Sequence, residues 1–180
     1  MEDKKGNSYI FLDIDGVLVS ANFYYNMENL FAKNEASVCI LGWVNDNLVK
    51  KLHRLIDQSG AKVVGVSSWF ACLDEIPDGL KQIEEILNIK IHDITEMSGG
   101  IYRGLAVLKW LKENNFNEDE DRFVVLDDAK KTCYGYPTLE VNGECGLTDK
   151  NVEEALLFLG KKQNINHYME LQMAAIKNDK

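Results

Sequence analysis

One stretch near the start of the chain decides the fold: Phe11-Leu12-Asp13-Ile14-Asp15-Gly16-Val17-Leu18-Val19. The apolar residues from Tyr9 to Leu12 are typical of a buried strand, which Gly16 interrupts. Side chains alternate between the two faces of a strand, so Asp13 and Asp15 are expected to point the same way. Two carboxylates held close together repel each other unless a cation neutralises them or one is protonated. The stretch therefore indicates a site for a hard cation such as Mg²⁺ or for a nucleophilic carboxylate.

An ordinary junction between a strand and a turn is the alternative interpretation, because Asp and Gly are common turn residues. The remaining sequence bears on this choice, since polar pairs follow two further apolar runs. Lys62 to Val66, rich in β-branched residues, is followed by Ser67 and Ser68, and Arg122 to Leu126 is followed by Asp127 and Asp128. Chance turns explain one such pair easily, but three pairs at three predicted strand ends are a more specific signal.

Apolar residues at helical spacing separate these strands. They predict helices near 45–58, 78–87, 101–111, 149–159 and 165–176, with shorter strands near 90–94 and 138–141. Ile101, Leu105, Leu108 and Leu111 are expected to form the apolar face of the third helix. Ile165, Met169, Met173 and Ile176 are expected to form that of the last, which would pack against the body or a second subunit. Alternating strands and helices predict an α/β fold with a doubly wound, mostly parallel, Rossmann-like sheet.

The composition excludes several classes of protein. A chain of 180 residues with 46% hydrophobic residues is long enough for one well-cored domain. Its net charge of -9 argues against a broad basic surface for nucleic acid or membrane. No apolar run approaches the roughly 18 residues that span a bilayer, and the four cysteines form no dense framework. We therefore expect a cytoplasmic protein with reduced thiols and no membrane segment.

Ligands in doubly wound sheets bind beyond the carboxyl ends of the strands, where the three polar pairs are expected to meet. With these motifs the sequence resembles the haloacid dehalogenase (HAD) superfamily, largely Mg²⁺-dependent phosphohydrolases. The resemblance implies that Asp13 is the nucleophile and Asp15 the general acid and base, and that Ser67 binds the transferring phosphoryl group. It also implies that Asp127 and Asp128 complete a Mg²⁺ site with Asp13 and the backbone carbonyl of Asp15.

The motifs Ser67-Ser68-Trp69, Arg103-Gly104 and Gly146-Leu147-Thr148 narrow the resemblance to small HAD domains related to RNA repair proteins. The third superfamily motif is normally a lysine or arginine that holds the phosphate. Arg103 is our choice for that role, with Lys109 and Lys130 as competitors and a plain surface arginine as the alternative. Ser68 is a second candidate phosphate donor or simply the start of a turn. Trp69 is expected either to stack on a base or, as is commoner for tryptophan, to pack.

The resemblance predicts a catalytic domain over residues 1–160, with an aromatic flap at about 20–42 and no full cap domain. Residues 161–180 are predicted to form a C-terminal amphipathic helix of the same unit. An uncapped site favours a large substrate, and our first expectation is a nucleotide or a polynucleotide phosphate end. The alternatives are a small-metabolite phosphatase and a HAD-fold binding or regulatory domain without turnover.

Overall fold

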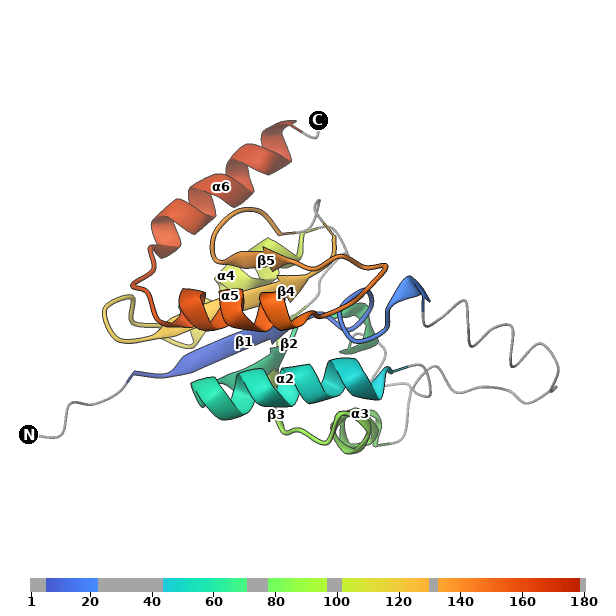
Figure 1. Ribbon diagram of the computed structural model, residues 1–180. Helices are drawn as coiled ribbons and strands as arrows, with labels where there is room; N and C mark the ends of the chain where they lie inside the picture. The colour runs from blue at the N-terminus through green and yellow to red at the C-terminus, as the bar shows by residue number, and fades with distance from the viewer. Residues whose placement is uncertain (1–5, 23–43, 71–77, 97–101, 130–132, 179–180) are drawn as a thin grey trace, which may run out of the picture.

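A sheet of parallel strands forms the centre of the molecule (Figure 1). The computed structural model describes residues 6–22, 44–70, 78–96, 102–129 and 133–178, and within them the sheet has five strands in the order β3-β2-β1-β4-β5. The strands are β1 (Ser8–Leu12), β2 (Lys62–Gly65), β3 (Ile91–Ile94), β4 (Arg122–Asp127) and β5 (Thr138–Glu140). All four neighbouring pairs are parallel, which confirms the predicted doubly wound, Rossmann-like sheet.

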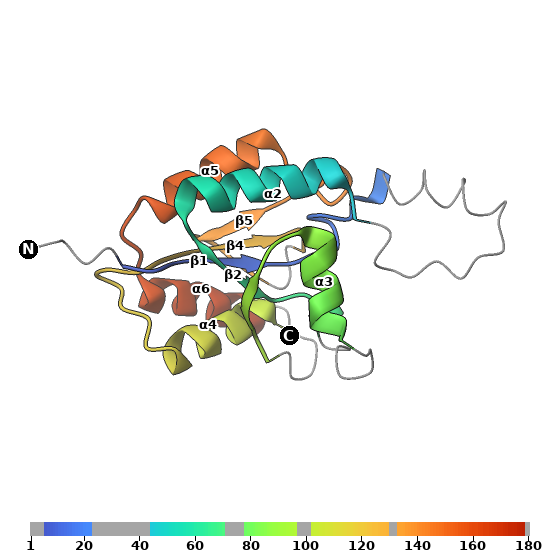
Figure 2. The ribbon, with the colours of Figure 1, turned by 90° about the horizontal axis from the view of Figure 1, so that it is seen from below.

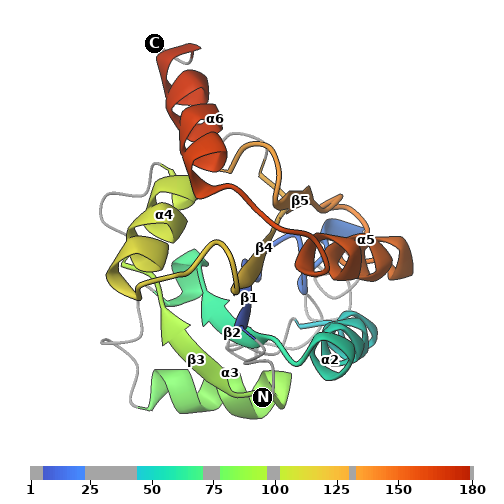
Figure 3. The same ribbon diagram turned by 90° about the vertical axis from the view of Figure 1, so that its left-hand side faces the viewer.

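Helices cover both faces of this sheet (Figures 2 and 3). On one face lie α2 (Asp46–Ser59) and α5 (Asp149–Leu159), and on the other lie α4 (Arg103–Glu113) and α6 (Ile165–Asn178). Near the β3 edge, α3 (Gly79–Leu87) packs into the same core as α2. A short 3-10 helix, η2 (Ser68–Phe70), follows β2. The β1 strand is buried from both sides, as its unbroken apolar run predicts.

Local signals fix the ends of two helices. The Asn45 side chain accepts a hydrogen bond from the backbone N–H of Asn47 and so caps α2, which ends at Gly60 in the left-handed region. Thr148 caps α5 in a reciprocal capping box with Asn151. Both caps anchor the helix pair that covers one face of the sheet.

The predicted apolar faces of two helices are wrong in part: Leu111 is buried as expected, and Leu108 and Ile165 pack against the core, but other members do not. Leu105 is 36% exposed, and Met169 and Met173 are each 45% exposed. In α4 the buried side chains include Val107 and Trp110, while α6 buries Tyr168 and Gln172. Helical spacing located both helices but not their orientation, because the largest buried groups are aromatic or polar rather than aliphatic.

The described residues contain no cap domain, as predicted. Nearly all of the predicted aromatic flap lies in 23–43, outside the described residues. Within the part of the chain that the structure describes, no helix has the length and apolar character needed to cross a membrane.

Candidate active site

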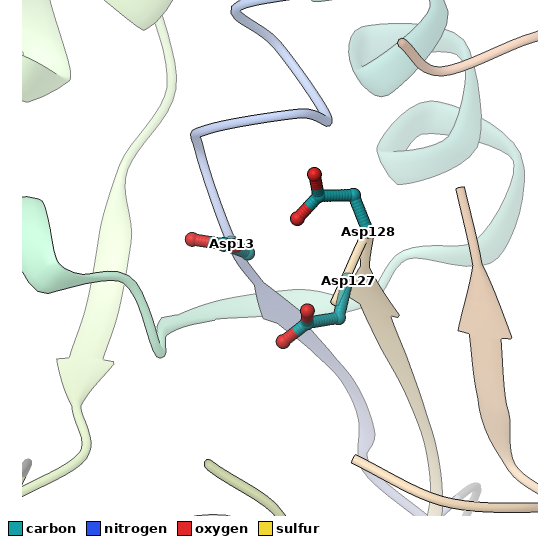
Figure 4. Close-up of side chains that lie close together, drawn as sticks. All are labelled: Asp13, Asp127 and Asp128. Atoms are coloured by element: carbon teal, nitrogen blue, oxygen red, sulfur yellow. The ribbon is translucent and has the colours of Figure 1, made fainter. Parts of the chain in front are cut away.

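The site lies where β1 and β4 end. The two strands run parallel with Leu12 opposite Leu126, so the residues that follow, Asp13 and Asp127, lie side by side. The Asp13 backbone N–H donates to the Leu126 carbonyl at 3.0 Å and carries the pairing one residue further. Figure 4 shows the resulting group of carboxylates from Asp13, Asp127 and Asp128. Strand register therefore brings together acidic residues more than 100 positions apart in the chain.

These three carboxylates form a compact acidic cluster. One oxygen from each of Asp13, Asp127 and Asp128 lies within 4.8 Å of the other two. Asp13 and Asp127 are buried, and Asp128 is partly buried. Gly16, at φ +72°, makes room for Asp128, because a Cβ there would come within 2.0 Å of Asp128 Oδ2. The cluster has the oxygen-rich, hard donor set that Mg²⁺ prefers.

Arg103 connects two of these carboxylates. It is the first residue of α4, and its Nη1 donates to Asp13 Oδ2 and to Asp127 Oδ1 and Oδ2, the latter two at 3.1 and 3.0 Å. Its side chain is only 16% exposed. Burial disfavours the charged guanidinium, but Asp13 and Asp127 outweigh burial and raise the pKa of Arg103. Arg103 thus stays charged beside the cluster, and its hydrogen bonds to the two carboxylates are charge-assisted.

Asp13 is held in a defined orientation at the centre of the site. Its Oδ1 accepts a hydrogen bond from the Ile14 backbone N–H at 2.8 Å, and Oδ2 faces Arg103. Burial raises the pKa of Asp13 to about 7, with Asp127 adding to the rise and Arg103 and a Ser67 hydrogen bond opposing it. Without a further cation, this carboxylate keeps a proton well above the pH at which aspartate ordinarily loses it.

That raised pKa predicts a pH-dependent stability for the metal-free protein. Between the ordinary value of 3.8 and about 7, folded Asp13 binds more protons than unfolded Asp13. Its contribution to the free energy of unfolding is therefore fully present below about pH 4 and is lost as the pH rises to about 7. Asp128, whose pKa burial also raises, acts in the same direction. Thermal melting of the wild type and of Asp13→Asn in chelator, at pH 5.5 and at pH 7.5, tests this prediction. The wild type should lose more stability than the variant between the two pH values. Equal losses in the two proteins would contradict the prediction.

Asp15 is not one of the three clustered carboxylates, but it lies close enough to Asp128 to help raise the pKa of that group. The β1 strand ends at Leu12, and a tight turn follows in which the backbone N–H groups of Leu18 and Val19 both donate to the Ile14 carbonyl. Both aspartates thus lie beyond the strand to which the period-two argument applies. Asp15 is exposed, in contrast to the buried Asp13.

Trp69 has a role that its residue type did not reveal. Its indole Nε1 donates to Asp15 Oδ1 at 3.0 Å, and its ring packs at the edge of the core. The packing alternative was therefore correct but incomplete. The sequence did place this tryptophan two residues after Ser67, the predicted phosphate-binding serine. Only the fold, however, shows that it contacts Asp15.

The remaining candidate site residues lie in different surroundings. Ser67 is buried beside Asp13, and its Oγ also accepts from the Trp69 backbone N–H at 3.4 Å. Ser68 is exposed at the start of η2, and its phosphate role stays a prediction. Lys109 pairs with Glu96 and Glu113 on the surface rather than with the cluster. Lys130 lies outside the described residues.

A cavity of about 620 Å³ opens beside the cluster on the Asp15 side. Its walls include Asp15 and Asp128 together with three polar residues, Ser20, Asn142 and Glu144. Backbone hydrogen bonds from Ala21 to Gly143 and from Asn22 to Glu144 hold its two walls together. The cavity is large enough for a sugar or nucleoside next to the site.

Comparison with known families agrees with this geometry. A family model described as the HAD domain in Swiss Army Knife RNA repair proteins matches residues 9–152, from β1 into α5. Comparisons with curated proteins and with solved structures gave no match. The match covers most of the chain and includes every candidate site residue. The chain therefore belongs to the family of HAD domains found in Swiss Army Knife RNA repair proteins, which implies a phosphohydrolase-type function.

Proposed function

We propose that the protein is a Mg²⁺-dependent phosphomonoesterase that works through an aspartyl-phosphate on Asp13. One observation carries the proposal. A buried carboxylate at the end of β1 contacts Arg103 and lies within 4.8 Å of Asp127 and Asp128, while Asp15 faces the adjacent cavity. The carboxyl ends of the strands thus bring together three groups that the reaction needs: a nucleophile, a cation that attracts phosphate and an acidic pair that can bind a metal ion.

The acidic cluster fits a divalent cation. Among the described residues three carboxylates converge here, and Arg103 pairs with two of them, Asp13 and Asp127. Burial and the nearby Asp127 charge raise the pKa of Asp13, which a bound cation would lower again. Asp13, Asp127 and Asp128 would hold the ion. When bound, Mg²⁺ supplies positive charge that stabilises the phosphoryl oxygens and keeps Asp13 ionised.

The protein's own residues account for the other parts of the reaction. Asp13 attacks phosphorus, the bond to the leaving oxygen breaks, and Asp15 gives that oxygen a proton. Asp15 then takes a proton from the water that hydrolyses the aspartyl-phosphate, so both carboxyl groups return to their starting states. Ser67 and Arg103 bind the phosphoryl oxygens and orient them for in-line attack. Trp69 holds Asp15 at the mouth of the cavity.

We propose a nucleotide or polynucleotide phosphate end as the substrate. The RNA repair proteins in which the family domain occurs support this class. The cavity beside Asp15 supports it too, because Ser20, Asn142 and Glu144 can exchange hydrogen bonds with sugar hydroxyls. The net charge of -9 disfavours long duplexes and favours a short or single-stranded end.

Hydrolysis of p-nitrophenyl phosphate tests the reaction itself. We expect turnover in Mg²⁺ and its loss in chelator, with recovery when Mg²⁺ is added back. After acid quenching, labelled phosphate should remain covalently bound to protein from the Mg²⁺ reaction only. Folded protein that binds Mg²⁺ but does not turn over any phosphate monoester would contradict the proposal and favour a binding or regulatory domain.

A substrate comparison then tests the class. Oligonucleotides with a 3′-phosphate or a 5′-phosphate, mononucleotides and sugar phosphates are compared by kcat/KM. A preference for an oligonucleotide end supports the proposal. Faster turnover of sugar phosphates would instead identify a small-metabolite phosphatase.

A further inference from the structure

The helix α6 places a buried polar side chain behind the site. Gln172 is 1% exposed, and its carboxamide meets both backbone groups of Tyr134. Its Oε1 accepts from the Tyr134 N–H at 3.2 Å, and its Nε2 donates to the Tyr134 carbonyl at 2.5 Å. Both polar ends of the side chain are therefore satisfied, and Gln172 fixes the backbone at Tyr134, which lies between β4 and β5.

The same carboxamide lies against the start of α4. A Cβ built on Gly104 would come within 2.1 Å of Gln172 Oε1 and 2.5 Å of its Cδ. Gly104 is buried and directly follows Arg103, the residue that contacts Asp13 and Asp127. One side chain thus joins the beginning of α4 to the segment behind β4.

A second residue of α6 reinforces this junction. Tyr168 is fully buried, and its hydroxyl accepts a hydrogen bond from Thr138 Oγ1 at 3.3 Å and contacts the Cys133 thiol. Cys133 is buried too, and it lies close enough to Arg103 and Asp127 to interact with them electrostatically. The segment that α6 holds therefore borders the ion pair of the site.

We propose that Gln172 is a positioning residue for phosphate binding, holding Arg103 where its guanidinium meets the phosphoryl oxygens. This inference rests on the proposed function. The family match ends at residue 152, so α6 lies outside the matched domain. The position of Arg103, the first residue of its helix, depends on what packs against that first turn, and Gln172 fills that place.

A comparison of two buried glutamines tests the inference. Gln172→Leu keeps most of the side-chain volume but loses both hydrogen bonds. The matched control is Gln163→Leu, because Gln163 is also buried and its carboxamide bonds both backbone groups of Phe123, at 2.8 and 2.6 Å. Phe123 lies near the start of β4, at the end of the strand opposite the site.

Both variants should lose similar stability, but only Gln172→Leu should lose phosphate affinity. We expect the dissociation constant of inorganic phosphate, from titration calorimetry in Mg²⁺, and the KM for p-nitrophenyl phosphate to rise about tenfold in Gln172→Leu. The kcat should change less. In Gln163→Leu both constants should stay at the wild-type value.

A double-mutant cycle tests the contact without relying on Gln172→Leu alone. Alanine is a better helix former than glycine, so Gly104→Ala should weaken phosphate binding only through its clash with Gln172. In the Gln172→Ala background the clash is absent, and adding Gly104→Ala should weaken binding no further.

The outcomes separate the inference from the proposed function. If wild type binds and hydrolyses phosphate esters while Gln172→Leu and Gln163→Leu bind phosphate equally, α6 is purely structural and the inference is overturned. The inference is also overturned if Gly104→Ala weakens phosphate binding as much in the Gln172→Ala background as it does in the wild type. If wild type neither binds phosphate nor turns over, the proposed function fails and this inference fails with it.

Discussion

Asp13→Asn is expected to lower turnover of p-nitrophenyl phosphate by about 10⁴-fold or more and to abolish the acid-stable phosphoprotein. The amide has nearly the shape of the carboxylate but is not a nucleophile toward phosphorus. Asp13 is fully buried, and Ile14, Ser67 and Arg103 all contact its carboxylate, so its oxygens are oriented before substrate arrives. Because the carboxylate is preorganised, we expect the large loss of turnover that follows removal of a nucleophile, not the smaller loss that follows removal of a binding residue.

The variant should fold normally, because it removes a buried charge whose ionised form burial disfavours. Asp57→Asn is a matched control, since Asp57 is an exposed aspartate of α2 and lines a cavity at the far end of the sheet. It should retain wild-type turnover. Turnover of Asp13→Asn at even a hundredth of the wild-type rate would assign the nucleophile to another residue.

Most of the fold could be predicted because its signals are local. The apolar runs that became β1, β2 and β4 are buried at every position after the first, and each is followed by polar residues at the edge where ligands bind in such sheets. Parallel order then requires these residues to converge. The proximity of Asp13 to Asp127 and Asp128 therefore followed from pattern and topology alone.

Arg103 could be predicted for a different reason. A cation in the first turn of a helix is unfavourable against the helix dipole unless anions lie nearby, and here Asp13 and Asp127 are those anions. The sequence could not exclude Lys109, because whether a helical lysine points to the site depends on which face of α4 is buried. That face includes Val107 and Trp110 besides the predicted Leu111, while the predicted Leu105 is exposed.

Contacts that depend on long-range packing could not be predicted. Trp69 donates a hydrogen bond to Asp15, a residue 54 positions away in the chain, and only the fold brings the two together. Gln172 reads as a polar surface residue on a methionine-rich helix, yet it is buried while Met173 is 45% exposed. Periodicity ranks residues by hydrophobicity, whereas a buried amide is stabilised by hydrogen bonds that no local pattern encodes.

Arg103→Met is the second change with a large expected effect. It keeps a long side chain but removes the positive charge that both Asp13 and Asp127 contact. We expect turnover to fall by about 10²–10³-fold, because a preorganised donor to the phosphoryl oxygens is lost. The midpoint of thermal unfolding in chelator should fall too, since removing one partner of a buried ion pair leaves the other charge uncompensated.

Lys109→Met is the matched control for this effect, because Lys109 lies on the same helix and forms ion pairs with Glu96 and Glu113, but at the surface. Solvent screens such pairs, so neither turnover nor the melting temperature should change appreciably. Inorganic phosphate binding separates the two roles of Arg103. If Arg103→Met melts early yet binds phosphate as tightly as wild type, the arginine only neutralises Asp13 and Asp127. If phosphate affinity falls with turnover while Lys109→Met keeps both, Arg103 fills the place of the phosphate-holding cation at this site.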